Sequence, residues 1–361
     1  MRFDARRILW GGLALAAGLM LPGLGLAQDA SYIYTYKGAD RAQKILEGAK
    51  KEGMVTLYSG MIVNQALRPM GDGFGKRYPD VRFEFFRGDT RELTQKITVE
   101  QRNRKQIADV VESTGVAGPT IKAGAAQPYF SPASADYAAH HVSKEGWYVA
   151  SRLSYFGMAY NTRKFSEQTV PKTYDALLDP KYKDALSWRA QSESGSDLFI
   201  AAILRSKGEK AGEDYLRALG KQNVVNYTGS ARALVDRVGQ GEYDLALNIF
   251  AHHPLISKAI GAPLDVQMLE PIPSVFGTVL AIKGAPHPHA AMLFIDYMLS
   301  LEAQTVLQAA DYFSPHPAVE ADPKLAKVLP KNAKMKELAM SSEELIDDND
   351  RIQAMYEKYF K

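Results

Sequence analysis

The chain has 361 residues, of which 46% are hydrophobic and 24% are charged, with a net charge of +3 and no cysteine. This hydrophobic content rules out intrinsic disorder for most of the chain, and the length suggests about two domains. The absence of cysteine excludes disulfides, thiolate metal sites and cysteine nucleophiles. The nearly balanced charge argues against a nucleic-acid-binding protein, which needs a concentrated basic face.

The first 27 residues have the layout of a secretory signal peptide. Three arginines precede an uncharged apolar run over 8–26, and small residues ending at Ala27 predict cleavage after that residue. A membrane anchor of nearly spanning length is the alternative, which Pro22 disfavours because it breaks the segment. The Arg6-Arg7 pair leaves twin-arginine export open. We therefore expect an exported chain.

The segment that follows alternates strands and helices. Its hydrophobic pattern predicts strands over 55–58, 81–86 and 108–111, with one helix ending near 76 and another over 90–104. This order predicts an α/β fold with a parallel sheet and helices on its faces. In such sheets ligands bind beyond the carboxyl ends of the strands.

The rest of the chain continues the alternation. It predicts strands over 153–160, 187–190, 223–227, 243–249 and 276–282, and helices over 197–207, from 230, 288–300 and 302–310. Ser300 is the expected N-cap of the last of these helices. A charged helical tail is expected over 320–361, broken at Pro323 and Pro330. No repeat of 20–50 residues is visible, which disfavours solenoids and propellers.

Small polar residues follow several predicted strands and precede predicted helices. Glycine allows a ligand to approach the backbone, hydroxyls donate hydrogen bonds to anions, and helix N-termini add free N–H groups. Helix capping alone is the alternative explanation for each element. Together the elements predict a site for a small anion, formed by Ser59, Gly60, Ser113, Thr114, Ser194, Gly195, Ser196, Thr228, Gly229 and Ser230.

Charged residues near strand ends are further candidates. Arg87 and Arg152 are placed to clamp a carboxylate or phosphate, and Asp89 and Glu112 to hold a metal or an amine. Adjacent histidines rarely ligate one ion, so among the histidines only His252 is a candidate metal ligand. No nucleophile elbow, phosphate-binding loop or dinucleotide fingerprint is present, which disfavours an enzyme.

Several stretches between about 42 and 318 resemble the periplasmic solute-binding proteins of ABC importers, of the ferric-iron-binding type (extracellular solute-binding family 1). They are 45–59, 108–113, 157–161, 171–180, 283–291, 294–297 and 300–304, in that order and spacing. The resemblance implies a two-lobed, type II periplasmic-binding-protein fold, in which each lobe is a mixed sheet flanked by helices. It places lobe 1 at 28–157 plus 273–308 and lobe 2 at 158–272 plus 309–361, with hinge strands near 150–160 and 272–283.

One family segment departs from the ferric pattern. Ferric members carry a tyrosine pair that ligates Fe(III), and the resemblance places those positions on Ala251 and His252, after Asn248 as a ligand-binding residue. Ferric iron prefers phenolate and carboxylate oxygen, whereas imidazole is a softer ligand. No cofactor is therefore certain. Fe(III) remains possible as the transported ligand, and a metal-free anion is favoured.

The resemblance implies a monomeric periplasmic protein that captures a small ligand by hinge closure and delivers it to an ABC permease in the inner membrane. We expect no enzymatic activity and no nucleic-acid partner. Two alternatives stay open, an exported enzyme on the same scaffold and a ligand sensor that feeds a signalling receptor.

Overall fold

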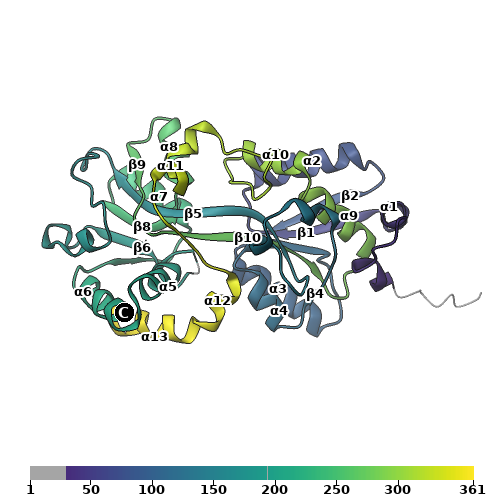
Figure 1. The fold of residues 1–361 in the computed structure, drawn as a ribbon, viewed down its shortest axis with the longest axis horizontal. Helices are drawn as coiled ribbons and strands as arrows, with labels where there is room; N and C mark the ends of the chain where they lie inside the picture. The colour runs from purple at the N-terminus through teal and green to yellow at the C-terminus, as the bar shows by residue number, and fades with distance from the viewer. Residues whose placement is uncertain (1–29, 193) are drawn as a thin grey trace, which may run out of the picture. The chain divides into compact units, whose positions relative to one another are not determined.

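Two long antiparallel strands run through the middle of the sheet arrangement. The computed structural model describes residues 30–192 and 194–361, so the predicted signal peptide lies outside the described residues. Its strands pair along the path β2-β1-β3-β10-β5-β8-β6-β7 (Figure 1). The central pair is β5 (Val149–Asn161) with β10 (Ile272–Ile282). These strands cover the segments predicted as hinges, and bending there stays a prediction.

The first lobe is built on three parallel strands. β1 (Met54–Ser59) lies between β2 (Arg82–Arg87) and β3 (Val110–Thr114) and pairs with both in parallel, as the predicted parallel sheet requires. β3 starts two residues later than expected, and β4 (Ala126–Gln127) pairs with the end of β10. The helices of this lobe are α1 (Arg41–Glu52), α2 (Arg68–Arg77), α3 (Thr90–Arg102), α4 (Ala117–Lys122), α9 (Pro288–Met298) and α10 (Leu301–Ala309).

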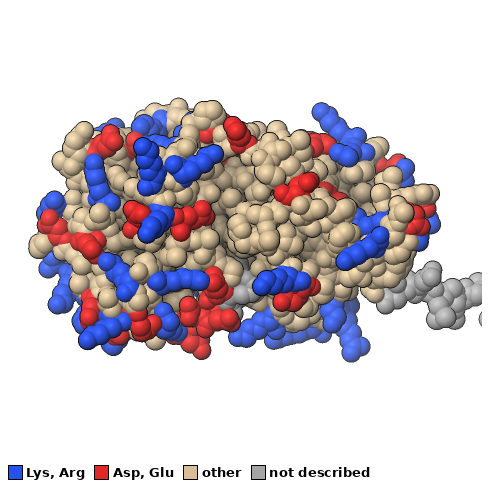
Figure 2. Space-filling view, in the orientation of Figure 1, with Lys and Arg blue, Asp and Glu red and all other residues tan. Residues whose placement is uncertain are grey.

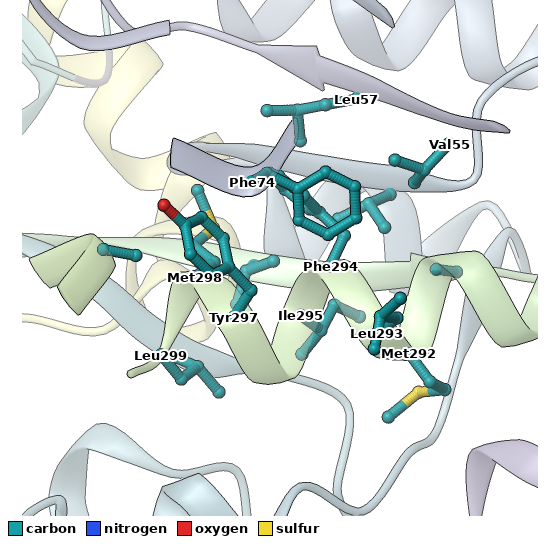
Figure 3. Close-up of a cluster of buried hydrophobic side chains, with 14 of the residues drawn as sticks. Val55, Leu57, Phe74, Met292, Leu293, Phe294, Ile295, Tyr297, Met298 and Leu299 are labelled. Atoms are coloured by element: carbon teal, nitrogen blue, oxygen red, sulfur yellow. The ribbon is translucent and has the colours of Figure 1, made fainter. Parts of the chain in front are cut away.

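An apolar helix, α9, fills the core on one face of this sheet. Figure 3 shows Val55 and Leu57 of β1 beside Phe74 of α2 and Phe294 of α9. The Phe74 and Phe294 rings meet edge-on at 5.3 Å. A helix that is apolar on nearly all sides needs such a buried position. In the described part of the chain no single helix is long and apolar enough to cross a membrane, and only α9 with α10, bent by 65°, passes as a pair.

The second lobe repeats the parallel pattern. β6 (Leu186–Arg189) pairs in parallel with β7 (Val225–Tyr227) and β8 (Leu245–Phe250), while β8 and β9 (Leu264–Gln267) run antiparallel to β5. Its helices are α5 (Ser196–Lys207), α6 (Glu209–Gly220), α7 (Ala231–Gln240) and α8 (His252–Ala259). The sequence did not predict α6 and β9.

The expected helical tail contains more than helices. Its elements are η7 (Pro323–Val328), α11 (Pro330–Ala333), β11 (Glu337–Ala339), α12 (Ser342–Asp347) and α13 (Asn349–Phe360). β11 pairs in parallel with the start of β10, and α13 buries Tyr356 and Phe360 beside Trp188 in the core of the second lobe. The tail thus takes part in both the central strands and the second lobe.

Short helical turns complete the described chain. They are η1 (Ala30–Tyr34), η2 (Val63–Leu67), η3 (Pro132–Asp136), η4 (Ala139–His141), η5 (Asp175–Leu178) and η6 (Pro180–Tyr182).

Candidate functional site

The carboxyl ends of the three parallel strands of the first lobe lie at the same edge of the sheet. In the pairing register Ser59 of β1 is opposite Arg87 of β2 and Glu112 of β3. The loops that follow these strands therefore start at one edge of the sheet, which is where ligands bind in such folds. Arg87 is exposed at this edge.

The predicted loops of this lobe are in direct contact. Thr90 Oγ1 lies 3.0 Å from Ser113 Oγ and donates a hydrogen bond to the Thr114 carbonyl oxygen at 2.8 Å. A Cβ at Gly60 would lie 2.6 Å from Ser113 Oγ, so a larger residue here would require the Ser113 hydroxyl to move. The buried hydroxyl of Thr114 has no hydrogen-bond partner among the described residues. Ser113, Thr114 and Gly60 thus form one group. Thr90 belongs to the same group, although the sequence pattern did not identify it as a site residue.

Beneath this group lies a buried ion pair. Glu112 is fully buried and accepts hydrogen bonds from Ser59 Oγ at 2.7 Å, Ser151 Oγ at 2.9 Å and Arg152 Nε at 2.8 Å. The Arg152 guanidinium also lies 5.0 Å from the centre of the Tyr312 ring. The proposed roles of Arg152 as a clamp and of Glu112 as a metal or amine partner are therefore not supported, because each side chain is buried and engaged by the other.

The second lobe brings together a matching group. Asn248 follows the strand residue Leu247, which pairs with Trp188, and its side-chain amide donates to the Gly195 carbonyl oxygen at 2.8 Å. A Cβ on Gly195 would lie 2.3 Å from the carbonyl oxygen of Arg189, so only glycine fits at this close approach. The end of β8 and the start of α5 are thereby held against the end of β6.

Arg189 ends β6 within this group. Its Nε donates to the Gly229 carbonyl oxygen at 3.1 Å, and its Nη1 lies 3.5 Å from Ser194 Oγ. The sequence pattern places Arg189 only in a short strand. The signal that identified the other candidates, a polar residue at a strand end before a run of serine and glycine, applies to it equally.

Some predicted site residues have simpler local roles. Ser230 is the N-cap of α7, since its Oγ accepts a hydrogen bond from the Ala233 N–H at 3.1 Å. Ser196 Oγ donates to the Asp197 carboxylate at 2.9 Å, and Thr228 is exposed. A ligand-binding role for these three residues stays a prediction.

One ion pair connects the two groups across the lobes. Arg189 Nη2 lies 4.0 Å from Oδ2 of Asp89, which also caps α3 by accepting from the Glu92 N–H at 2.9 Å. A second pair of opposite charges, Asp197 and Arg91, also lies between α5 and α3. Burial raises the pKa of Asp197 in α5, and the positive charge of Arg91 in α3 acts in the opposite direction.

The face of the molecule seen in Figure 2 does not favour one sign of charge. On the face shown in Figure 2, Lys and Arg side chains are interspersed with Asp and Glu. Attraction for an anion must therefore come from groups close to it, such as Arg189 and the helix N-termini.

His252 is buried at the start of α8, 3% exposed, with its ring 5.7 Å from that of Tyr312. Burial, followed by the charges of Arg152 and Arg232, lowers the pKa of His252 to about 3. Among the described residues no group of three or more histidine, aspartate or glutamate side chains is placed to hold a metal ion. Metal ligation by His252 stays a prediction.

Comparison with known proteins agrees with this architecture. A family model described as bacterial extracellular solute-binding protein matches residues 105–339. An uncharacterized protein of Haemophilus influenzae is 29% identical over 243 residues, which cover 64% of this chain and 68% of that protein.

Two relatives carry names that state a ligand. A putative 2-aminoethylphosphonate-binding periplasmic protein of Salmonella typhimurium is 27% identical over 59% of this chain and 63% of its own length. The major ferric iron-binding protein of Neisseria meningitidis serogroup B is 27% identical over 48% of this chain and 54% of its own length. The matches thus cover less than two thirds of these two relatives.

Solved structures share the fold. The periplasmic binding protein P5PA has a TM-score of 0.73 at 23% identity and covers 86% of this chain and 100% of its own. AfuA of Actinobacillus pleuropneumoniae, with fructose-6-phosphate bound, has a TM-score of 0.72 at 23% identity over 85% of this chain and 98% of its own. The predicted two-lobed, type II periplasmic-binding-protein fold is confirmed. Because the family model spans more than half of the sequence, the chain belongs to the bacterial extracellular solute-binding protein family.

Proposed function

We propose that this protein captures a small anion between its two lobes and delivers it to an ABC permease. The observation that carries the proposal is the placement of the strand-end groups. Gly60, Ser113 and Thr114 of the first lobe and Ser194 and Gly195 of the second belong to groups joined by the pair of Asp89 with Arg189. A ligand that touches both groups favours the closed arrangement of the lobes.

The local chemistry suits a phosphate or phosphonate group. α3 and α5 are 13 and 12 residues long, and their N-terminal turns lie at the two groups. Free N–H groups and the positive end of the helix dipole favour an anion there. Hydroxyls of Ser113 and Ser194 can donate to anionic oxygens, and the Arg189 guanidinium matches them in geometry.

The named relatives support two ligand classes. One is named for a phosphonate, and one solved neighbour holds a sugar phosphate. Another is named for ferric iron, which makes Fe(III), bound directly or through a chelating anion, the second candidate. The residues at the tyrosine positions implied by the family, Ala251 and His252, favour the anion because they offer no phenolate oxygen.

The proposed function also implies a cellular location, an oligomeric state and a partner. Relatives named as periplasmic, together with the predicted signal peptide at 1–27, support export and cleavage after Ala27. The mature chain acts as a monomer, has no enzymatic activity of its own and has no nucleic-acid partner. Lobe closure at β5 and β10 presents both lobes to the permease.

A thermal-shift screen of the mature chain, residues 28–361, tests the proposal. The probes are inorganic phosphate, methylphosphonate, 2-aminoethylphosphonate, fructose 6-phosphate and ferric citrate, each against sodium chloride at matched ionic strength. A ligand at a hundredfold excess over its Kd should stabilise the protein by about 2.7 kcal/mol. Small-angle scattering should show a smaller radius of gyration with the same ligand.

Three results would count against the proposal. If no probe shifts the unfolding midpoint or the radius of gyration, anion capture is wrong. If a bound probe is chemically converted, the exported-enzyme alternative is correct. If ferric iron without an anion stabilises the protein, and His252→Ala abolishes that effect, the metal candidate replaces the anion.

A further inference from the structure

The pair of Asp89 with Arg189 places a carboxylate where the proposed ligand would bring its negative charge. Asp89 lies in the first lobe, just before α3, and Arg189 lies in the second lobe at the end of β6. Their charged atoms are 4.0 Å apart. The side chain of Asp89 is 56% exposed and that of Arg189 is 25% exposed, so the carboxylate is the more accessible partner.

Arg189 is held in place independently of Asp89. Its Nε donates to the carbonyl oxygen of Gly229, and its Nη1 contacts Ser194 Oγ. The guanidinium is therefore oriented by two elements of the second-lobe group, and its Nη2 lies 4.0 Å from Asp89 Oδ2 of the first lobe. A cation fixed in this way is suited to bidentate recognition of an anionic oxygen pair.

Asp89 is also held in place independently of Arg189. One carboxylate oxygen, Oδ1, accepts the hydrogen bond of the Glu92 N–H at the start of α3, and the other, Oδ2, faces Arg189. The helix N-terminus and Arg189 would both attract an anion. The Asp89 carboxylate already interacts with both of them.

We propose that Asp89 is a built-in competitor of the ligand: its carboxylate occupies Arg189 across the lobes until the anionic group of the ligand replaces it. This inference rests on the proposed capture of an anion. Arg189 is then the specificity-determining cation of the second lobe, and Asp89 sets how strongly charged a ligand must be. A neutral or singly charged ligand competes poorly with a carboxylate, whereas a phosphate or phosphonate dianion competes well.

A second pair of charges at the lobe junction can hold the lobes together while the ligand replaces Asp89 at Arg189. Arg91, two residues after Asp89, is in electrostatic range of Asp197 in the second lobe, whose carboxylate is also bonded to Ser196 and Gln353. This relation does not involve Arg189 and can persist when Asp89 is displaced. Closure of the lobes therefore does not depend on Asp89 alone.

Isothermal titration of inorganic phosphate into the mature chain tests the inference, with Asp89→Asn as the main variant. Asparagine keeps the cap of α3 and removes only the charge. We expect Asp89→Asn to bind phosphate about two- to fivefold more tightly, the range that corresponds to a partly exposed ion pair. The control is Asp80→Asn, which neutralises an aspartate of similar exposure, 58%, paired with Lys50 at 3.0 Å outside both groups.

A double-mutant cycle makes the result specific. Arg189→Gln should weaken phosphate binding, and Asp89→Asn should bring no gain in the Arg189→Gln background. Thermal unfolding of each variant shows that it is folded, and Arg189→Lys, which keeps the charge, serves if Arg189→Gln is not folded. Equal or weaker binding by Asp89→Asn, or an equal gain with and without Arg189, overturns the inference while leaving anion capture intact. Absence of phosphate binding by every variant, together with no response to any probe of the screen, overturns both.

Discussion

Glu112 illustrates how much of the binding edge depends on one buried side chain. It accepts hydrogen bonds from Ser59, Ser151 and Arg152, so the end of β1, the middle of β3 and the start of β5 are joined through a single carboxylate. A buried ion pair contributes little net stability when both partners are present, but removing one partner leaves an uncompensated buried charge. Glu112 therefore positions the loops above it without contacting a ligand.

Replacing Glu112 by Gln should destabilise the protein by about 3–5 kcal/mol, because Arg152 keeps its charge without a counter-ion. Urea unfolding of the mature chain measures this loss. The matched control is Glu84→Gln, whose carboxylate is 45% exposed and pairs with Arg82, and which should cost at most about 1 kcal/mol. Adding Arg152→Met to Glu112→Gln should recover part of the loss. A Glu112→Gln protein as stable as the control would contradict the prediction.

His252 should make stability depend on pH. Burial, with Arg152 and Arg232, lowers the pKa of His252 to about 3, whereas the unfolded chain has the ordinary value near 6.5. The unfolded state then binds the proton between these values, and stability falls as pH drops below about 6.5. The slope due to this residue is about 1.4 kcal/mol per pH unit.

In His252→Gln that part of the slope should disappear between pH 6 and pH 4.5, as measured by urea unfolding at each pH. Some slope should remain, since burial also lowers the pKa of the neighbouring His253. Above pH 7.5 the wild type and the variant should show parallel stability curves. Parallel curves across the acidic range would disprove a buried neutral His252.

Where a strand end carried a run of small polar residues, the sequence identified residues that the structure brings together, and their role in ligand binding stays a prediction. Ser113, Thr114, Ser194 and Gly195 lie in the two groups that the structure brings to the lobe junction. Arg189 carries the same strand-end signal, but its contacts with Gly229 and Asp89, which distinguish it from other arginines, are with residues distant in sequence. The pairing of Arg152 with Glu112 was missed for the same reason.

At the scale of single elements, the N-terminus of α7 allows helix capping to be distinguished from ligand binding. Its N-cap Ser230 was predicted as a ligand contact, yet its oxygen already accepts the Ala233 N–H. The structural cap and the proposed binding role make different predictions for one substitution.

We expect Ser230→Ala to lower the free energy of unfolding by about 1 kcal/mol, the usual contribution of an N-cap, without weakening phosphate binding. Ser300→Ala is the matched control, since Ser300 caps α10 with its oxygen 3.4 Å from the Ala303 nitrogen. Urea unfolding and phosphate titration on both variants provide the comparison. A clear loss of phosphate affinity in Ser230→Ala alone would establish it as a ligand contact.

Element types followed from the hydrophobic pattern wherever the run was long and regular. The parallel order of β1, β2 and β3 and the cap at Ser300 are confirmed. β11 was missed because three residues carry too little periodicity, and its place beside β10 is set by long-range pairing. α6 was missed since Gly208, with a φ of 81°, separates it from α5 by a single residue.

For the whole molecule, the two lobes are not consecutive pieces of chain. β10 lies between β3 and β5 in the sheet, and the tail returns to pair with β10 before α13 packs on the second lobe. The length suggested two domains, and only the resemblance to a known family suggested that the chain crosses between them more than once.

A chain that ends at Leu269 lacks β10 and the tail. We expect it to show no cooperative thermal transition, because β3 and β5 both lose their central neighbour. Circular dichroism of residues 28–269 measures this. A chain ending at Met340 keeps β10 and β11 and should retain a cooperative transition at a lower midpoint, since only α12 and α13 are removed. Cooperative unfolding of the shorter chain would contradict the prediction.

The late position of β10 also determines when the first lobe can fold. During synthesis β1, β2 and β3 are made early, but their sheet lacks the partner of β3 until residue 282 is available. Pairing between strands so distant in sequence is slow, because a long loop must close first. We therefore expect the first lobe of a nascent chain to stay loosely packed until β10 has been made.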